Sequence, residues 1–420
     1  MRIAINIDGQ FQTMTGVQNY VDSLLRALAA SGTKHEIAAF APLLGSPEPL
    51  HDAFREGRFA WGDAHAADRI RVDSAGTAAL VARLPGVAGR PRLRSLAHRL
   101  DARLPAIKRA TVWRRSAYAS RRYDVMHLPA TNPLPYEQWR AKNFVVTIYD
   151  MTIRLFAEAH AADNIAAWNR LFDFAKNRCA RILTISEASR RDIVRLLDVP
   201  EERVVVTPLA PRASVRPVPP DAARREAARV LDIAPDVPFV LYAGSLEKRK
   251  NLAQLVKSFA QATCDLPSAP RLVLAGHGWD DYGARLRDLA RDCGVADRLI
   301  LPGYVPNEPM NALLSACTVF AYVSEYEGFG LPPLEAMACG APVVASNVSS
   351  LPEVVGEAGI QVAPQDTEAI AAALKRLLTD GHENARRREL SRARAALFSW
   401  ERTAALTLGA YEAAAAASAP

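Results

Sequence analysis

Short apolar runs alternate with longer amphipathic stretches along most of this chain. In the first half, apolar runs of strand length lie at residues 3–7, 36–40, 125–128, 144–149, 181–185 and 203–207, and helical spacing appears between them at 17–30 and 187–197. The second half repeats the pattern from residue 239 onward, with further runs at 271–275, 299–302, 319–323 and 342–345. Strands that alternate with helices are typical of doubly wound parallel sheets. The pattern predicts an α/β protein.

A proline-rich stretch at residues 208–221 separates the two halves of this pattern. Few contacts are expected to cross such a stretch, so we interpret it as a linker. The 420 residues, of which 50% are hydrophobic, are enough for two α/β domains of about 200 residues each. We therefore expect a first domain at 1–207, the linker at 208–221, a second domain at 222–400 and a final helix at 401–420.

The sequence has neither an evident membrane-spanning run nor a signal peptide. No apolar run approaches the roughly 20 residues that span a bilayer, and residues 1–7 have the character of a first strand. The five cysteines form no Cys-x-x-Cys pair, which argues against a zinc site and against a disulfide framework. They are Cys179, Cys264, Cys293, Cys317 and Cys339. We expect a cytoplasmic protein whose cysteines are small core residues.

Two carboxylates flank a glycine turn in the most informative stretch of the chain. Glu327 and Glu335 are eight positions apart, and the turn between them opens a predicted helix after the apolar run 319–323. Backbone N–H groups in such a turn lack helical partners and form a cradle for an anion or a hydroxyl. The N–H groups in question are those of Gly328, Phe329, Gly330 and Leu331. Carboxylates accept hydrogen bonds from sugar hydroxyls. Two solvated glutamates are the alternative, which the small residues at 336–340 disfavour.

Basic residues stand at the start of another predicted helix. The apolar run that ends at residue 241 leads into a glycine loop with Gly244 and Ser245, and a helical pattern begins at Leu252. The cations Arg249 and Lys250 are unfavourable beside a helix N-terminus unless an anion binds there. We interpret the loop as a clamp for a diphosphate, and a solvated basic turn is the alternative.

These motifs resemble the donor site of a known enzyme family. Nearly every position from Tyr326 to Val344 resembles the signature of the retaining glycosyltransferases of family four. The resemblance implies the GT-B fold, in which two Rossmann-like, doubly wound parallel-sheet domains face each other across a cleft. It also implies that Glu327 and the amides of residues 329–331 lie beside the donor sugar and its phosphates, and that Glu335 binds the ribose hydroxyls. The loop with Gly-x-x-x-x-Arg-Lys-Asn resembles the family's pyrophosphate-binding loop, and the last helix would pack against the first domain.

Gly16 opens a helix shortly after the first predicted strand. A glycine there lets backbone amides approach the donor phosphates, and the segment resembles the N-terminal glycine loop of the family. A plain helix-cap turn is the alternative. No Gly-x-Gly-x-x-Gly fingerprint follows any predicted strand, which argues against a dinucleotide-dependent dehydrogenase.

Three residues are candidates for the acceptor side. Residues 145–152 resemble a strand of the family that ends in His-Asp-Leu, but Tyr149 stands where the subgroup usually has His. The substitution removes a group that titrates near neutral pH. Asp150 lies at the C-terminal end of this strand, where it is placed to orient the acceptor hydroxyl or to take its proton. His127 ends another strand, and a satisfied core histidine is its more frequent role.

Positive charge is concentrated in one segment. The formal net charge is +7, and residues 83–122 hold about a dozen Arg and Lys against the single acid Asp101. Leucines and Trp113 are interleaved at helical spacing, which fits the surface of an anionic bilayer. No basic-aromatic motif accompanies the patch, so no nucleic-acid partner is expected, and a solvated helix face is the third interpretation. We favour contact with the inner face of the cytoplasmic membrane, because acceptors in the resembling family are often lipid-linked.

The sequence leaves two function classes. The first is a glycosyltransferase, a hexosyltransferase that moves a sugar with retention from a nucleotide sugar to a glycan or polyprenyl-linked acceptor, in surface polysaccharide or O-antigen synthesis. Subgroup resemblance at residues 149–150 and 186–189 favours mannose. Arg249 and Lys250 would stabilise the leaving diphosphate beside Glu327, and Asp150 completes the candidate catalytic set. No Asp-x-Asp motif occurs, so neither a metal nor another cofactor is expected. The second class is a non-catalytic protein that binds nucleotide sugars or membrane surfaces.

Overall fold

A computed structural model describes residues 1–7, 16–40, 71–73, 116–131, 136–267, 269–278 and 281–417. The chain divides into two compact units. Unit 1 comprises Met1–Ile185, Arg190–Thr207 and Trp400–Pro420, and unit 2 comprises Ser186–Ser189 and Pro208–Ser399. Most of the predicted basic segment, residues 83–115, lies outside the described residues. Among the helices that the structure describes, none has the length and apolar character needed to cross a bilayer.

Unit 1 is built on a seven-stranded parallel sheet with the strand order β3-β2-β1-β4-β5-β6-β7. The strands are β1 (Arg2–Asn6), β2 (Glu36–Phe40), β3 (Arg71–Asp73), β4 (Val125–Leu128), β5 (Asn143–Thr147), β6 (Cys179–Thr184) and β7 (Val204–Val206). The six predicted strands are confirmed to within two residues at each end. The short β3 was not predicted, because Arg-Val-Asp holds a single apolar position.

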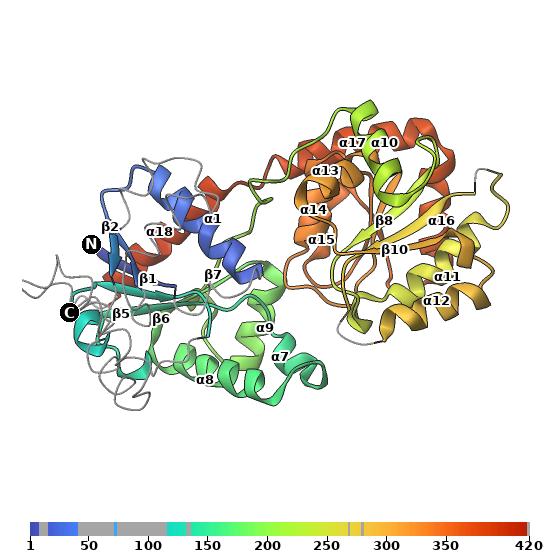
Figure 1. Ribbon diagram of the computed structural model, residues 1–420. Helices are drawn as coiled ribbons and strands as arrows, with labels where there is room; N and C mark the ends of the chain where they lie inside the picture. The colour runs from blue at the N-terminus through green and yellow to red at the C-terminus, as the bar shows by residue number, and fades with distance from the viewer. Residues whose placement is uncertain are drawn as a thin grey trace, which may run out of the picture. The chain divides into compact units, whose positions relative to one another are not determined.

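The described helices of unit 1 come from the first half of the chain and from its last helix. They are α1 (Gly16–Ala30), α7 (Thr152–Leu155), α8 (Ala162–Arg178), α9 (Glu187–Leu197), whose first residues belong to unit 2, and α18 (Trp400–Ala416). Figure 1 shows α18, in red, beside α1, in blue. The buried Tyr411 and Ala414 of α18 pack with Ile3, Val125 and Val145 of the sheet. The last helix therefore completes the core of the unit that contains the first strand.

Unit 2 is built on a six-stranded parallel sheet with the order β10-β9-β8-β11-β12-β13. The strands are β8 (Phe239–Ala243), β9 (Arg271–Ala275), β10 (Leu299–Gly303), β11 (Val319–Tyr322), β12 (Val343–Ser346) and β13 (Ile360–Val362). Each predicted strand is present, and β13 was missed because its three residues carry a polar centre. The order reverses between β8 and β11, so the loops that follow these two strands meet at one sheet edge.

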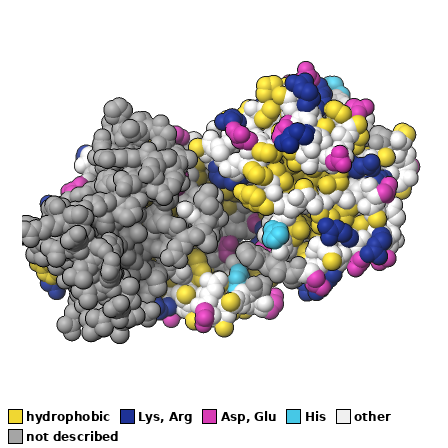
Figure 2. Space-filling view, in the orientation of Figure 1, with side chains coloured by type: hydrophobic (Ala, Val, Ile, Leu, Met, Phe, Trp, Pro, Cys, Tyr) yellow, Lys and Arg dark blue, Asp and Glu magenta, His cyan; other side chains and the backbone are white. Residues whose placement is uncertain are grey.

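Helices cover the sheet of unit 2 (Figure 1). They are α10 (Pro220–Leu231), α11 (Leu252–Thr263), α12 (Tyr282–Asp292), α13 (Asn307–Ala316), α14 (Leu331–Ala338), α15 (Leu351–Val355), α16 (Thr367–Thr379) and α17 (Gly381–Ala395). Single 3₁₀ turns in the two units cover Tyr136–Gln138, Ala157–Ala159, Glu201–Arg203, Lys248–Lys250, Ala296–Arg298 and Gly356–Ala358. The face of unit 2 in Figure 2 mixes basic, acidic and apolar side chains, so no single sign of charge marks it.

The proline-rich stretch that we expected to be a linker is part of unit 2. Asn311 donates a hydrogen bond to the Ser214 carbonyl at 2.7 Å, and the Val218 N–H donates to Ser315 Oγ at 3.0 Å. α10 already begins at Pro220, where proline is favoured in the first helical turn. Proline excludes regular structure in residues 208–219, but it does not prevent side-chain contacts with α13.

Candidate functional site

The candidate site lies at the carboxyl edge of the unit 2 sheet, where the strand order reverses. The loop after β8 carries Arg249 and Lys250, and the loop after β11 carries Glu327. In open parallel sheets, ligands bind at such switch points. The loops that follow the two neighbouring strands start side by side and then run in opposite directions, which leaves a crevice between them. The two motifs that the sequence singled out separately are therefore brought together by strand order.

The loop after β8 is held closely against the sheet. Gly276 has a φ of +150°, and a Cβ on it would lie 1.7 Å from the carbonyl oxygen of Gly244, so this approach requires glycine. The Tyr242 hydroxyl donates to the carbonyl of Ser245 at 2.7 Å. Asn251 adopts a left-handed conformation and donates through Nδ2 to Val323 O at 3.1 Å, which ties the loop to the end of β11.

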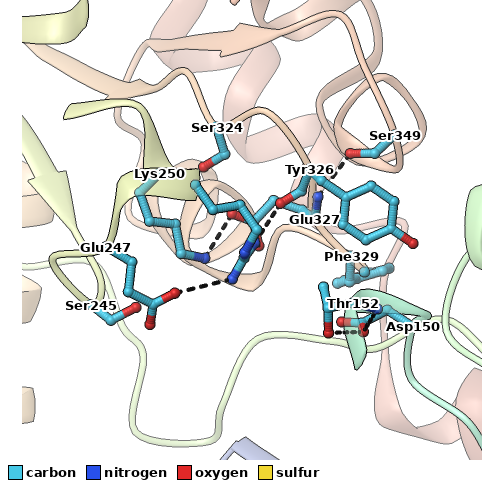
Figure 3. A network of polar contacts seen from close by, with 12 residues as sticks. Asp150, Thr152, Ser245, Glu247, Lys250, Ser324, Tyr326, Glu327, Phe329 and Ser349 are labelled. Carbon is cyan, nitrogen blue, oxygen red and sulfur yellow. Dashed lines mark hydrogen bonds and ion pairs between the residues drawn. The ribbon is translucent and has the colours of Figure 1, made fainter. Parts of the chain in front are cut away.

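Lys250 and Glu327 form a buried ion pair. Lys250 Nζ lies 2.7 Å from Glu327 Oε1, and the two residues are 7% and 8% exposed. Figure 3 shows the two side chains pointing toward each other. Lys250 Nζ also donates to the Tyr322 hydroxyl at 3.2 Å, and Arg249 Nη1 lies 3.5 Å from Glu327 Oε2. Arg249 Nη2 also lies 3.5 Å from Glu247 Oε2, so the two cations face two carboxylates, of which that of Glu247 is the more exposed.

The cluster controls the ionisation of Glu327. Burial by itself would raise the pKa of Glu327, but the charges of Lys250 and Arg249 together lower that pKa below its ordinary value. Glu327 is therefore an ionised acceptor at neutral pH. The pKa of Glu327 is lower in the folded state than in the unfolded state. The ion pair with Lys250 therefore stabilises the folded protein at neutral pH, and this stabilisation is lost as the pH falls through the folded-state pKa.

The turn from Glu327 to Gly330 is fixed by serine side chains. The Glu327 N–H donates to Ser349 Oγ at 2.9 Å, and the Ser350 hydroxyl donates to Glu327 O and Phe329 O at 2.8 and 2.7 Å. Ser186 donates to Gly328 O at 2.7 Å. We assigned no role to these serines from the sequence. Small polar residues that follow β12 at the same sheet edge were the available signal for Ser349 and Ser350.

The backbone of this turn presents unpaired donors. Within the part of the chain that the structure describes, the N–H groups of residues 328–331 donate to no protein acceptor, although their carbonyls are engaged. Gly330 has a φ of +108°, and a Cβ there would lie 2.8 Å from Leu351 Cδ2. Buried N–H groups are almost always paired, so consecutive unpaired donors beside a lysine mark a place for an anion or a hydroxyl.

Glu335 lies within α14 and is 5% exposed. It does not contact the Lys250 cluster directly in any described hydrogen bond or ion pair, but pairs with Arg212. Arg212 Nε lies 2.6 Å from Oε1 and Nη2 lies 2.8 Å from Oε2, which is a bidentate salt bridge. Sequence reasoning missed Arg212, because it lies in the stretch that was interpreted as a linker.

The acceptor-side candidates lie in unit 1. Asp150 is half-buried after β5, and its Oδ1 accepts hydrogen bonds from the N–H and the hydroxyl of Thr152 at 2.9 and 2.5 Å. This carboxylate therefore orders the start of α7. The Tyr149 hydroxyl donates to Pro129 O at 2.6 Å, and burial holds the pKa of Tyr149 well above its ordinary value. The Tyr149 hydroxyl is thus a neutral tether and not a titrating base.

His127 is completely buried in unit 1. Its Nδ1 lies 2.8 Å from the Tyr411 hydroxyl of α18, and its Nε2 lies 2.8 Å from Thr147 Oγ1. Burial lowers the pKa of His127 to about 3. This environment matches the satisfied core histidine that was the alternative for this position, and offers the side chain no route to a ligand.

The low pKa of His127 predicts a pH dependence of stability. Below the ordinary pKa of 6.5, the unfolded chain binds a proton that the folded chain does not, so stability falls as the pH drops from 6.5 to about 3. The slope from this residue approaches about 1.4 kcal/mol per pH unit. We expect the difference in unfolding free energy between wild type and His127→Phe to shrink as the pH falls from 7 to 4 in urea titrations. The exposed His382→Phe is the control, and a difference that does not change with pH would contradict the prediction.

Two predicted features remain at the margin of the described residues. Gly16 is the first residue of α1, and a Cβ on it would meet no heavy atom of the described residues within 4 Å. The residues before it, 8–15, are not described. In the basic segment only residues 116–122 are described, where Arg121 lies 5.7 Å from the ring centre of the exposed Tyr118. The described residues contain no cluster of three His, Cys, Asp or Glu placed to bind a metal ion. The expectation that the protein needs neither a metal nor another cofactor stays a prediction.

Comparisons with known proteins agree with this geometry. A family model described as Glycosyl transferases group 1 matches residues 223–394, and one described as Glycosyl transferase 4-like domain matches residues 15–210. O-antigen chain mannosyltransferase B of Escherichia coli is 36% identical over 309 residues, which are 71% of this chain and 77% of that relative. Serotype-specific mannosyltransferase WbdA of Escherichia coli is 31% identical over 241 residues, which are 57% of this chain and 29% of WbdA.

Among solved structures, the Anabaena protein Alr3699/HepE in complex with UDP and glucose matches with a TM-score of 0.67 and 16% identity. The match covers 97% of this chain and 98% of that protein, and it shows that the fold is GT-B. Two parallel-sheet units, the two family models and the well-covered mannosyltransferase relative lead to one conclusion. The chain belongs to the glycosyl transferases group 1 family, and it is a glycosyltransferase.

Proposed function

We propose that the unit 2 site binds a nucleotide diphosphate sugar and that the protein transfers the sugar, with retention, to a hydroxyl. The observation that carries the proposal is the row of unpaired N–H groups at residues 328–331 beside the buried Lys250 and Glu327. A diphosphate supplies acceptors for those donors and charge for Lys250 and Arg249. Glu327 and Glu335 supply acceptors for sugar and ribose hydroxyls.

The chemistry follows from the cations and the backbone N–H groups that meet at this turn. When the anomeric carbon–oxygen bond breaks, negative charge grows on the leaving diphosphate, and preorganised cations and N–H groups stabilise it. The electron pair of that bond leaves with the diphosphate, the acceptor oxygen forms the new bond to the anomeric carbon on the same face, and the diphosphate accepts the proton of the acceptor hydroxyl. In such a route, Lys250, Arg249 and the N–H groups of residues 328–331 provide most of the stabilisation of the transition state. Asp150 remains the candidate for orienting the acceptor hydroxyl, and Gly16 and the loop at Gly244 and Ser245 the candidates for further phosphate contacts.

The substrate class draws support from the relatives. The 36% identical relative is named an O-antigen chain mannosyltransferase, so we propose mannose as the sugar and a glycan or polyprenyl-linked acceptor in surface polysaccharide synthesis. Membrane contact through residues 83–122 is a separate proposal that rests on composition. Flotation with anionic liposomes that is unchanged after Arg114 and Arg115 are neutralised would count against it.

A donor and acceptor assay tests the proposal. Purified protein is incubated with GDP-mannose, UDP-glucose and related donors, together with a polyprenyl diphosphate-linked oligosaccharide, and the product linkage is determined by NMR. We expect transfer from GDP-mannose, an α-linked product from the α-linked donor, and loss of transfer in Glu327→Ala but not in Glu325→Ala. Transfer from another donor would overturn the proposed sugar, a β-linked product would overturn retention, and the lack of any donor binding would overturn the site.

A further inference from the structure

Arg212 forms a fork on Glu335 in the middle of an irregular segment. Besides the two bonds to the carboxylate oxygens, Arg212 Nη1 donates to Asn307 Oδ1 at 3.2 Å, at the first residue of α13. The Arg212 side chain is 31% exposed, whereas that of Glu335 is 7% exposed. The hydrogen bonds to Glu335 raise the pKa of Arg212 above its ordinary value. The pair is thus a partly buried bidentate salt bridge with one open side.

The geometry leaves acceptor capacity on the carboxylate. An ionised carboxylate has about four lone-pair sites, and a bidentate guanidinium occupies one on each oxygen. The Arg212 N–H also donates to Oε1, at 3.5 Å, so Oε2 keeps a free lone pair while the second lone pair of Oε1 is only weakly engaged. No other described side chain donates to either oxygen of Glu335. A pair of neighbouring hydroxyls, as on the ribose of a nucleotide, offers two donors at a matching spacing. The bidentate contact therefore fixes the plane of a carboxylate whose Oε2 can accept a further hydrogen bond and whose Oε1 can accept one in place of the 3.5 Å contact.

The segment around Arg212 has other contacts that hold it to α13. Ser214 O and the Val218 N–H are anchored to α13 by Asn311 and Ser315. Arg216, four positions further, makes an ordinary surface pair with Glu308 at 3.1 Å, with side chains 68% and 85% exposed. If the Arg212–Glu335 salt bridge only held the segment in place, it would repeat what these contacts already do. The salt bridge also orients the carboxylate of Glu335, which is a side chain of the proposed ligand site.

We propose that Arg212 is a positioning residue, which holds the Glu335 carboxylate in the orientation that accepts both ribose hydroxyls of the donor nucleotide. The proposal rests on the proposed function, because it assigns Arg212 to the same site. Without Arg212, the Glu335 side chain would be free to rotate and its buried charge would be uncompensated. The nucleotide would then lose the hydrogen bonds of its ribose but keep those of its diphosphate.

A comparison of nucleotides with and without ribose hydroxyls tests this inference. The affinities of GDP and UDP, and of their 2′,3′-dideoxy counterparts, are measured by calorimetry for wild type, Arg212→Met, Arg212→Lys and the control Arg216→Met. We expect wild type to prefer the ribonucleotide of its own base by about tenfold to a hundredfold, since two hydrogen bonds to a charged acceptor are involved. Arg212→Met should reduce this preference to about threefold or less, and Arg216→Met should leave it unchanged.

The outcomes separate the inference from the proposed function. If Arg212→Met weakens ribo- and dideoxynucleotides equally, Arg212 only supports the fold, and the inference is overturned while the donor site stands. If Arg212→Met keeps the wild-type preference for ribonucleotides over dideoxynucleotides, the positioning role of Arg212 is also overturned. If wild type binds neither GDP nor UDP, the proposed function itself fails. Circular dichroism checks folding, and if the methionine variant unfolds, Arg212→Lys decides: it keeps the charge without the fork and should lose most of the ribose preference. In turnover, KM for the donor should rise more than kcat falls.

Discussion

Replacing Lys250 with methionine should lower sugar transfer by about 100-fold to 1,000-fold, because a preorganised cation at the leaving diphosphate would be lost. The change should also destabilise the protein by about 3 kcal/mol, since the buried Glu327 would keep only the more distant Arg249 as a partner. Turnover with saturating donor, nucleoside diphosphate affinity and urea unfolding measure the three effects. We expect the affinity to fall together with the rate.

Lys248→Met is the matched control for this change. Lys248 lies two positions earlier in the same 3₁₀ turn and is exposed, and it pairs with no carboxylate in the described residues. Its substitution should alter stability by about 0.5 kcal/mol or less and leave transfer nearly unchanged. Equal effects of the two substitutions would show that general positive charge near the loop, and not the buried ammonium, matters for transfer.

Replacing Glu327 with glutamine should separate turnover from nucleotide affinity. The carboxamide keeps the shape of the side chain but removes the negative charge that faces Lys250 and Arg249. We expect transfer to fall by about 100-fold, because the acceptor beside the donor sugar is weakened. Nucleoside diphosphate affinity should hold or rise, since the two cations are then available to the phosphates.

The exposed Glu325, two positions earlier, gives the control Glu325→Gln, which should behave like wild type. The double variant with Lys250→Met should destabilise the protein less than the sum of the single changes, because each single change leaves a buried charge without its nearest partner. Strict additivity in urea unfolding would contradict the coupling between the two side chains. A parallel loss of nucleotide affinity and transfer in Glu327→Gln would assign Glu327 to simple donor binding.

The two central motifs were visible in the sequence because their chemistry is local. A glycine turn between an apolar run and a helix exposes backbone N–H groups whatever the rest of the fold does, and residues 327–331 have this pattern. The basic residues at the start of α11 are unfavourable without an anion for the same local reason. The strands were predicted well because apolar runs of buried parallel strands are nearly continuous, and β3 and β13 were missed because they lack that continuity.

The partners of these residues were not predictable from the sequence. Lys250 and Glu327 are 77 positions apart, and Arg212 and Glu335 are 123 apart. Arg212 was hidden in a proline-rich stretch, since such composition indicates only that regular structure is absent and not what its side chains contact. His127 shows the converse, because nothing near it in the sequence reveals that Tyr411 of the last helix occupies its ring nitrogen.

The sequence by itself therefore determined the α/β class, most of the strands, and the residue types that meet a polar ligand, because periodicity and turn chemistry act over a few residues. Only the tertiary structure decided that β8 and β11 are neighbours, that Lys250 neutralises Glu327, and that Glu335 is held by Arg212. The physical reason is that the order of strands in a parallel sheet is set by the packing of whole helices and crossovers. That order, and not the local pattern, decides which loops meet at the sheet edge.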